Sequence, residues 1–128
     1  MKHIVQKYVG HQQRLYAVRS AFGGPNESFV LCGCEDNQVY IWQRYRGSLL
    51  EIISGHTGTV NAVIWPCKTN FSLMISASDD HTLVLWHFDE HFKEDFPINA
   101  KTDKSSDAAL ENADAADIAV DSSHWIAL

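Results

Sequence analysis

Short apolar segments alternate with polar turns along the first 88 residues of the chain. The segments are rich in Val, Ile, Leu and aromatic residues, and turn formers such as Gly23-Gly24-Pro25-Asn26 separate them, which is the pattern of short β-strands. Two of them, 39–42 and 83–86, are continuous apolar runs, as expected for strands buried on both faces. The segments in chain order are 4–9, 16–22, 29–33, 39–42, 49–53, 60–65, 73–78 and 83–86.

The pattern repeats once along the chain. Gly10-His11 recurs as Gly55-His56, and EDNQVYIW at 35–42 recurs as DDHTLVLW at 79–86, so the period is 44 to 45 residues. Repeats of about 40 to 45 residues with a GH start and a WD-like end are typical of β-propeller blades. On these motifs, residues 1–88 resemble the WD-repeat (WD40) family. The resemblance implies an all-β fold with two antiparallel four-stranded WD40 propeller blades, which is an incomplete propeller.

The repeat divides the chain into four expected parts. Residues 1–9 are expected to form the last strand of a preceding blade, 10–54 a first WD repeat, and 55–88 a second WD repeat that lacks its fourth strand. Residues 89–128 hold ten acidic and three basic residues with many Ser and Ala, which predicts a disordered or weakly helical acidic tail. A short helix is expected near 107–120. The apolar end 124–128 is interpreted either as a docking motif or as a chain end with no role, and we favour the second.

The resemblance also implies a structural tetrad, in which the GH histidine, a strand serine, the turn aspartate and a tryptophan form a hydrogen-bonded chain. Indole only donates, neutral imidazole donates and accepts, and carboxylate only accepts, so such a chain satisfies all its members when buried. In the first repeat Cys32 and Cys34 occupy the serine positions, which predicts a three-membered chain there. The positions assigned are His11, Asp36 and Trp42, and then His56, Ser76 or Ser78, Asp80 and Trp86.

The turn after each tetrad aspartate departs from the usual glycine, with Asn37 and His81 in its place. Both residue types are enriched at positive φ, so we expect the turn to be kept. Because the His-Ser-Asp set occurs at matching places in both repeats, without a nucleophile elbow or Gly-rich oxyanion loop, it indicates fold maintenance. The sequence predicts no catalytic residues and no enzyme activity.

Charge and cysteine content narrow the class of partner. The chain carries a formal charge of −6 and no Lys/Arg cluster, so we expect no nucleic-acid binding. Cys32-Gly33-Cys34 has no second ligand pair, so neither a metal site nor a cofactor is predicted. We also expect no membrane insertion, because no apolar run is long enough. Three cysteines fit no secreted disulfide framework, which favours a cytoplasmic or nuclear location.

The residues between the motifs are more specific than the motifs themselves. Three segments, SAFGGPNESF at 20–29, EDNQVYIW at 35–42 and SGHTGTVNAVIW at 54–65, resemble the final two repeats of the WD-repeat subunit of the CTLH/GID ubiquitin ligase. This resemblance implies a scaffold that binds ligase subunits or substrates through the loops at the GH end of each blade. The expected partner-contact rim, called the rim below, consists of Arg14, Tyr16, Glu35, Thr59, Asn61 and Asp79.

Two alternatives to the ligase interpretation stay open. The chain could be a generic peptide-binding WD module of another complex, or a truncated chain with little independent function. A closed propeller needs roughly four to eight blades, and two blades leave strand edges and apolar faces uncovered. Self-association through the open blade edges is therefore a further expectation.

Overall fold

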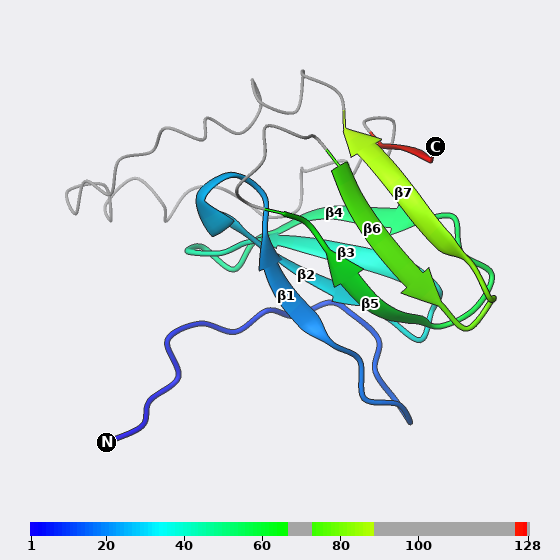
Figure 1. Cartoon of the computed structure of the whole chain (residues 1–128). Coiled ribbons are helices and arrows are strands. Elements are labelled where there is room, and N and C mark those ends of the chain that lie inside the picture. The colour runs from blue at the N-terminus through cyan, green and yellow to red at the C-terminus, as the bar shows by residue number, and fades with distance from the viewer. Residues whose placement is uncertain (67–72, 89–124, 128) are drawn as a thin grey trace.

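The structure is a computed structural model that describes residues 1–66, 73–88 and 125–127. Within these residues the chain forms two four-stranded antiparallel sheets (Figure 1). The first sheet consists of β1 (Ser20–Gly23), β2 (Phe29–Gly33), β3 (Gln38–Gln43) and β4 (Leu49–Ser54), in that order. One 3-10 turn, η1 (Pro25–Glu27), joins β1 to β2. Each strand pairs with the next strand in the chain, as the short connections require.

The second sheet repeats this order with β5 (Val60–Ile64), β6 (Leu73–Ser78), β7 (Leu83–Phe88) and β8 (Trp125–Ala127). Strand β8 comes from the far end of the chain and pairs antiparallel with the last three residues of β7. Residues 55–88 contribute three strands, and β8 from outside that range takes the fourth position, so the favoured interpretation of 124–128 as a terminus without a role is wrong. An unpaired strand edge leaves N–H and C=O groups without partners, and β8 satisfies part of the β7 edge. The helix expected near 107–120, like the rest of the acidic tail before Trp125, lies outside the described residues.

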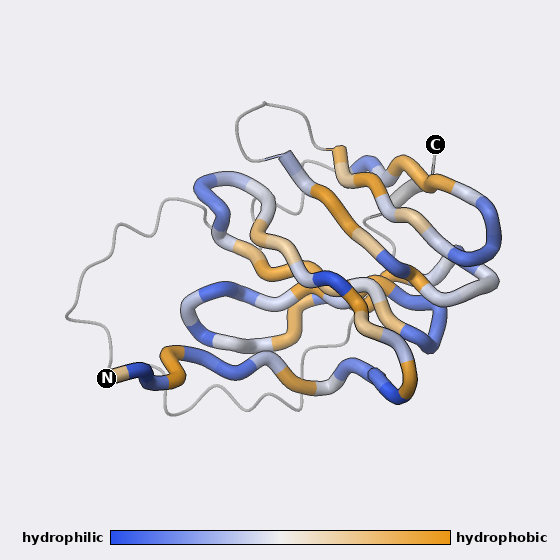
Figure 2. Tube along the Cα trace, turned by 60° about the horizontal axis from the view of Figure 1, so that its bottom comes forward, coloured by the Kyte–Doolittle hydropathy of each residue, from blue (hydrophilic) through white to orange (hydrophobic). Residues whose placement is uncertain are grey.

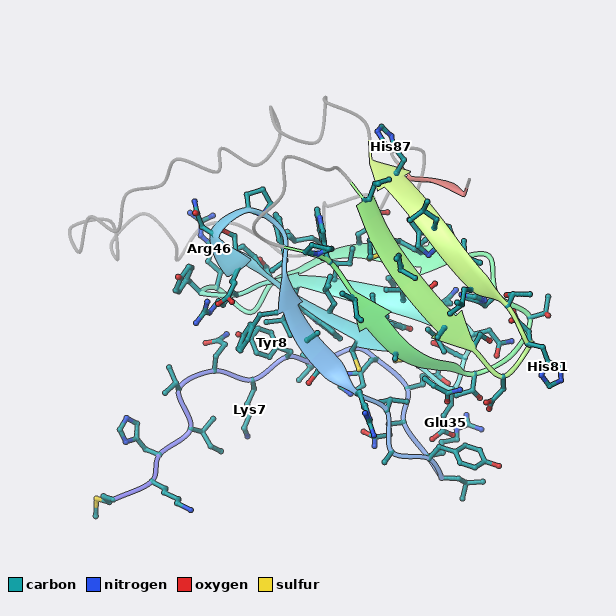
Figure 3. The ribbon with its side chains drawn as sticks, in the orientation of Figure 1. Lys7, Tyr8, Glu35, Arg46, His81 and His87 are labelled. Carbon is teal, nitrogen blue, oxygen red and sulfur yellow. The ribbon has the colours of Figure 1, made fainter. Side chains whose placement is uncertain are left out.

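Residues 1–9 form no strand in this structure, and the expectation that they are the last strand of a preceding blade stays a prediction. A strand needs a hydrogen-bonded neighbour, and both described sheets are formed by other segments. Side-chain direction nevertheless alternates here, because Tyr8 is directed toward the first sheet and Lys7 away from it (Figure 3). The Tyr8 hydroxyl donates to the Arg44 carbonyl at 2.6 Å, which attaches the segment to the turn between β3 and β4.

The two sheets pack face to face around one apolar core. Figure 2 shows the hydrophobic positions on the strands and the hydrophilic ones at the turns. Phe29 of the first sheet stacks on Trp65, which follows β5, with ring centroids 5.3 Å apart and planes 7° apart. Leu31 and Ile41 of the first sheet and Met74 of the second are fully buried in the same cluster. Burial of a large aliphatic side chain stabilises a fold by about 1.5–3 kcal/mol, so this shared core fixes how the sheets pack.

Gly33 allows the two sheets to approach closely at one end. A Cβ atom at this position would overlap the carbonyl group and side chain of Val60 at the start of β5. The Val60 amide in turn donates to the Cys34 carbonyl at 3.0 Å, which ties the second sheet to the end of β2. Glycine is therefore required here by the close approach of two backbones.

Candidate protein-interaction site

In the second sheet, three buried side chains and the half-buried Asp80 form one continuous hydrogen-bonded chain. The Trp86 indole N–H donates to Ser76 Oγ at 2.8 Å, and Ser76 Oγ lies 2.7 Å from His56 Nε2. The other imidazole nitrogen, Nδ1, lies 2.8 Å from Asp80 Oδ2. Ser76 is fully buried and His56 is 7% exposed. Trp86, Ser76, His56 and Asp80 are all among the residues that the sequence analysis assigns to the tetrad of the second repeat.

The direction of each hydrogen bond follows from what each group can do. The indole only donates, so the Ser76 hydroxyl accepts from it and gives its own proton to His56 Nε2. His56 then carries its proton on Nδ1 and donates it to Asp80. Every donor of the chain has an acceptor in this arrangement, which is the condition for burying polar groups without a desolvation cost.

Ser78, the alternative serine, has a different role from Ser76. Its hydroxyl donates to the Gly58 carbonyl at 2.9 Å and accepts from the Asp80 amide at 3.2 Å. It therefore stabilises the turn between β6 and β7 and the loop after the GH pair. Of the two candidate serines, Ser76 is the one that bonds to His56 and Trp86.

Asp80 has further hydrogen-bond donors that the sequence analysis did not include. The Thr82 hydroxyl donates to its Oδ1 at 2.6 Å, and the Thr57 amide donates to its Oδ2 at 3.0 Å. These bonds, with that from His56, hold the pKa of Asp80 well below its ordinary value of 3.8, and the largest contribution is the Thr82 hydroxyl. A hydroxyl residue two positions after a turn aspartate is the signal that could have revealed Thr82.

The first sheet departs from the predicted three-membered chain. Trp42 Nε1 donates to the Val9 carbonyl at 2.9 Å, and Asp36 Oδ2 accepts from the Tyr40 hydroxyl at 2.6 Å. Among the described residues, His11 Nδ1 has no hydrogen-bond partner, and the His11 ring contacts the Trp42 ring edge-on at a centroid distance of 5.4 Å. The prediction that His11, Asp36 and Trp42 are linked to one another is therefore wrong.

The physical reason for the difference is the missing serine. Cys32 stands at the position that corresponds to Ser76, and a thiol is too weak a donor and acceptor to bridge indole and imidazole. Tyr40 then provides the stronger donor to Asp36, and burial together with this bond raises the pKa of the Tyr40 hydroxyl. Cys32 and Cys34 are both free and buried, as expected for small apolar residues. Contact with Cys32 and burial together raise the pKa of the Cys34 thiol.

The turns that carry the aspartates have the predicted backbone. Asn37 has a φ of 69° and His81 a φ of 68°, so the expectation of positive φ at both positions is confirmed. Figure 3 places Glu35 and His81 at the same end of the molecule, with Arg46 and His87 at other ends of the strands. The turns of both sheets therefore contribute to one surface.

On the first sheet, Glu35 holds the loop that follows the GH pair. Its Oε1 atom accepts backbone N–H bonds from Arg14, Leu15 and Tyr16 at 2.8, 2.8 and 2.7 Å. These three bonds, that from Tyr16 first, lower the pKa of the Glu35 carboxyl. Three successive amides around one anion form a backbone nest, so Glu35 fixes the loop rather than offering its carboxylate to a partner. The Arg14 side chain and the 59% exposed Tyr16 are left free to contact other molecules.

On the second sheet, the corresponding rim residues contact one another. Asn61 Nδ2 donates to Asp79 Oδ1 at 2.6 Å, and the Asp79 amide donates to the Thr59 carbonyl at 3.0 Å. Asp79 is exposed, whereas Thr59 and Asn61 are half-buried. An acidic residue just before the turn aspartate thus organises the loop after the GH pair in both sheets. The structure brings the six rim residues together in two groups of three.

The described part of the chain contains no group of three or more His, Cys, Asp or Glu side chains arranged to hold a metal ion. Within the described residues, no helix is long and apolar enough to cross a bilayer.

Two four-stranded sheets packed face to face, one of them with a hydrogen-bonded Trp-Ser-His-Asp chain, define a pair of propeller blades. The family model described as "WD domain, G-beta repeat" matches residues 2–43 and 47–87. The chain therefore belongs to the WD-repeat family. Below, the first sheet and its turns are called the first blade, and the second sheet and its turns the second blade.

Curated relatives support the same assignment. The chain is 45% identical over 86 residues to a WD repeat-containing protein 26 homolog of Arabidopsis thaliana, covering 67% of this chain and 14% of the relative. It is 40% identical over 83 residues to GID complex subunit 7 of Schizosaccharomyces pombe, covering 65% and 16%. It is 29% identical over 98 residues to a Denticleless protein homolog of Gallus gallus, covering 76% and 13%. The chain thus spans about one-seventh of the length of these relatives.

Proposed function

We propose that this chain is a non-catalytic protein-binding module, and that it serves a GID-type E3 ubiquitin ligase as a scaffold or substrate-recruiting component. WD-repeat proteins are typically protein-interaction scaffolds, which supports the first part. The second part is supported by the similarity to a fission yeast protein named as subunit 7 of the GID complex, and by the inter-motif residues at 20–29 and 54–65.

The observation that carries the proposal is the fixed loop at the rim. Glu35 binds three backbone amides of the loop, so Arg14 and Tyr16 project from a backbone that is already ordered. Arg and Tyr are among the residue types that dominate binding energy at protein interfaces. An ordered backbone reduces the entropy lost on association, which favours a site for another protein.

The tetrad supports the non-catalytic part of the proposal. His56 is buried, and both of its ring nitrogens are bonded to other members of the tetrad. Its hydrogen-bonding capacity serves the fold, in contrast to a general base, which must reach a substrate proton.

Affinity purification of the tagged chain from its source cells, followed by mass spectrometry, tests the proposal. We expect the wild-type chain to recover subunits of a ubiquitin ligase, and Arg14→Ala/Tyr16→Ala to lose at least 90% of that recovery (tenfold, roughly 1.4 kcal/mol). A matched control is Tyr45→Ala/Arg46→Ala, which removes the same two residue types from the exposed turn between β3 and β4. This control should bind like the wild-type chain.

The outcomes separate the two parts of the proposal. Recovery of no ligase subunit would contradict the ligase assignment. If a different set of proteins were recovered and the rim variant alone lost them, the chain would be a WD module of another complex. Equal loss of partners in the rim variant and its control would contradict the assignment of the binding surface.

A further inference from the structure

Two free thiols lie together at the rim end of the first blade. Cys32 belongs to β2, and Cys34 directly follows Gly33, the last residue of that strand. Side chains two residues apart on a strand point to the same face, and both thiols belong to one buried cluster with Tyr40 and Trp42. The two thiols are also hydrogen-bonded to each other. Two unbridged thiols in contact can exchange into a disulfide when an oxidant is present.

The thiol pair is a property of the first blade alone. The second blade has Ser76 and Ser78 at the corresponding positions. Ser76 is bonded to His56 and Trp86, and Ser78 to the loop after the GH pair. A four-stranded blade therefore forms with hydroxyl groups at both places, so the fold itself does not require thiols there.

The two thiols differ in how readily they react. The Gln12 amide donates to Cys34 Sγ, the Cys34 thiol donates to Cys32 Sγ, and the Cys32 thiol donates to the Gly33 carbonyl at 3.1 Å. The bond from Cys34 lowers the pKa of the Cys32 thiol, whereas contact with Cys32 raises that of Cys34. Cys32 is 6% exposed and Cys34 is fully buried. Cys32 is thus the thiol that an oxidant meets first, because the thiolate is the reactive form.

The backbone of Cys34 connects the thiol pair to both halves of the rim. Its carbonyl accepts from the Asn37 amide at 3.3 Å and from the Val60 amide at 3.0 Å. Val60 follows the rim residues of the second blade in the loop after its GH pair. The next residue in the chain, Glu35, holds the backbone of 14–16 through three N–H bonds. A displacement of Cys34 therefore reaches every part of the rim.

Closing a disulfide between these two residues requires such a displacement. Side chains two residues apart on an extended strand stand about 6.6 Å apart, whereas the Cβ atoms of a disulfide lie about 3.8 Å apart. The chain must therefore bend at Gly33, the single residue between them. A Cβ atom at Gly33 would overlap the Val60 carbonyl group, so the two backbones are already in close contact there. The bend cannot stay local and must shift Cys34 and the residues bonded to it.

We propose that hydrogen peroxide converts Cys32 and Cys34 into a reversible disulfide, and that this disulfide releases the rim loop of residues 14–16. The disulfide would then regulate the binding surface. This regulatory role rests on the proposed function, whereas the disulfide and the release of the loop do not.

The reaction needs only the two thiols and the peroxide. The Cys32 thiolate attacks one peroxide oxygen and breaks the O–O bond, which gives a sulfenic acid and a hydroxide ion that takes up the proton released from Cys32. The Cys34 sulfur then attacks the Cys32 sulfur, and the sulfenic oxygen leaves as water with the Cys34 proton. Two thiols lose two electrons in total, and one peroxide becomes two water molecules. A dithiol such as dithiothreitol reverses the step by thiol–disulfide exchange.

Peroxide treatment of the Cys67→Ser chain tests the proposal, because Cys32 and Cys34 are then its only cysteines. We expect the intact mass to fall by two hydrogen atoms, and both cysteines to resist alkylation until dithiothreitol is added. Amide hydrogen exchange at 14–16 should become at least tenfold faster in the oxidised chain and return to its original rate after reduction. Exchange at 84–86, in the β7 strand paired with β6, should change less than twofold and is the internal control.

Cys34→Ser in the same background is the matched control, because it introduces the residue that the second blade has at this position. Peroxide should not change its exchange at 14–16 by more than twofold, since no disulfide can form within the chain. If Cys32 and Cys34 stayed unlinked at every peroxide concentration, the disulfide would be ruled out. A disulfide that left exchange at 14–16 unchanged, or equal acceleration in Cys34→Ser, would overturn the link to the rim. Failure of the partner purification would contradict the proposed function alone, because hydrogen exchange reports on the loop itself.

Discussion

Ser76 lies at the centre of the tetrad, and its removal tests the energetic role of that network. Ser76→Ala deletes the hydroxyl that lies 2.8 Å from the Trp86 indole nitrogen and 2.7 Å from His56 Nε2. The indole nitrogen of Trp86 and Nε2 of His56 would each lose a hydrogen-bond partner in a buried site. Each unsatisfied buried group costs about 1–3 kcal/mol, and partial relaxation reduces the sum, so we expect a loss of about 2–4 kcal/mol. That is a large share of the roughly 5–15 kcal/mol that stabilises an ordinary domain.

The matched control for Ser76→Ala is Cys32→Ala at the corresponding position of the first blade. There Trp42 donates to the Val9 carbonyl, so deleting the thiol leaves that bond in place. The small buried thiol is lost together with its weak hydrogen bond to the Gly33 carbonyl at 3.1 Å, which costs about 1 kcal/mol. Urea denaturation followed by tryptophan fluorescence measures both changes in the free energy of unfolding. If Ser76→Ala lowered the free energy of unfolding by no more than Cys32→Ala does, the inference that a hydrogen-bonded tetrad stabilises the second blade, and that none stabilises the first, would be refuted.

Three further predictions concern Asp80, Glu35 and Gly33. Because the folded-state pKa of Asp80 is below its ordinary value of 3.8, its contribution to stability is present above that pH and is lost as the pH falls below it. Asp80→Asn should therefore flatten the decline in stability that acid titration of the wild-type chain shows; an unchanged pH profile would count against this. Glu35→Ala should speed amide hydrogen exchange at residues 14–16 at least tenfold by removing the acceptor of three N–H groups, and Glu35→Gln should have a smaller effect. Equal exchange in Glu35→Ala and wild-type protein would contradict the nest. Gly33→Ala should destabilise the chain by about 1–3 kcal/mol, because the added methyl group meets the Val60 backbone. In contrast, Ser20→Ala on exposed β1 should leave the urea midpoint almost unchanged.

The sequence predicted the features that depend on local pattern and repetition. Each of the seven strands of 20–88 overlaps one predicted segment, because apolar runs and turn residues determine them locally, and four of them extend one or two residues beyond it. The first of these begins at Ser20, four residues later than the segment that starts at Tyr16, because the Glu35 carboxylate holds the backbone of 14–16 in a loop. A side-chain contact over 19 residues leaves no local signal in an apolar run.

The two ends of the chain were predicted least well, because strand pairing there depends on distant residues. β8 has only three residues, too few to show a period of two, and its partner lies almost 40 residues earlier in the chain. Residues 4–9 have a strand-like pattern, but pattern alone does not provide a hydrogen-bonded neighbour. Strand-forming residues are therefore necessary at these positions without being sufficient.

Within the tetrad, the sequence could not decide between the two serines. Ser76 and Ser78 are two residues apart on β6, so alternation places both on the same face. Their positions along β6 distinguish them. Ser76 is paired with Val84, two residues before Trp86, whereas the Ser78 hydroxyl donates to the Gly58 carbonyl in the loop after the GH pair. In the first blade, Tyr40 competes with His11 for Asp36, and the result depends on distances that residue types do not specify.

Site-specific photo-crosslinking tests most directly whether the rim binds partner proteins. Tyr16, at the rim, and Tyr45, in the turn between β3 and β4, are 59% and 63% exposed, so a benzophenone amino acid at either position samples solvent to a similar extent. We predict that irradiation in cells produces adducts with ligase subunits from position 16, and that position 45 yields at most one-tenth as much. Adducts of equal yield from both positions, or from position 45 alone, would contradict the assignment of the rim as the protein-binding surface.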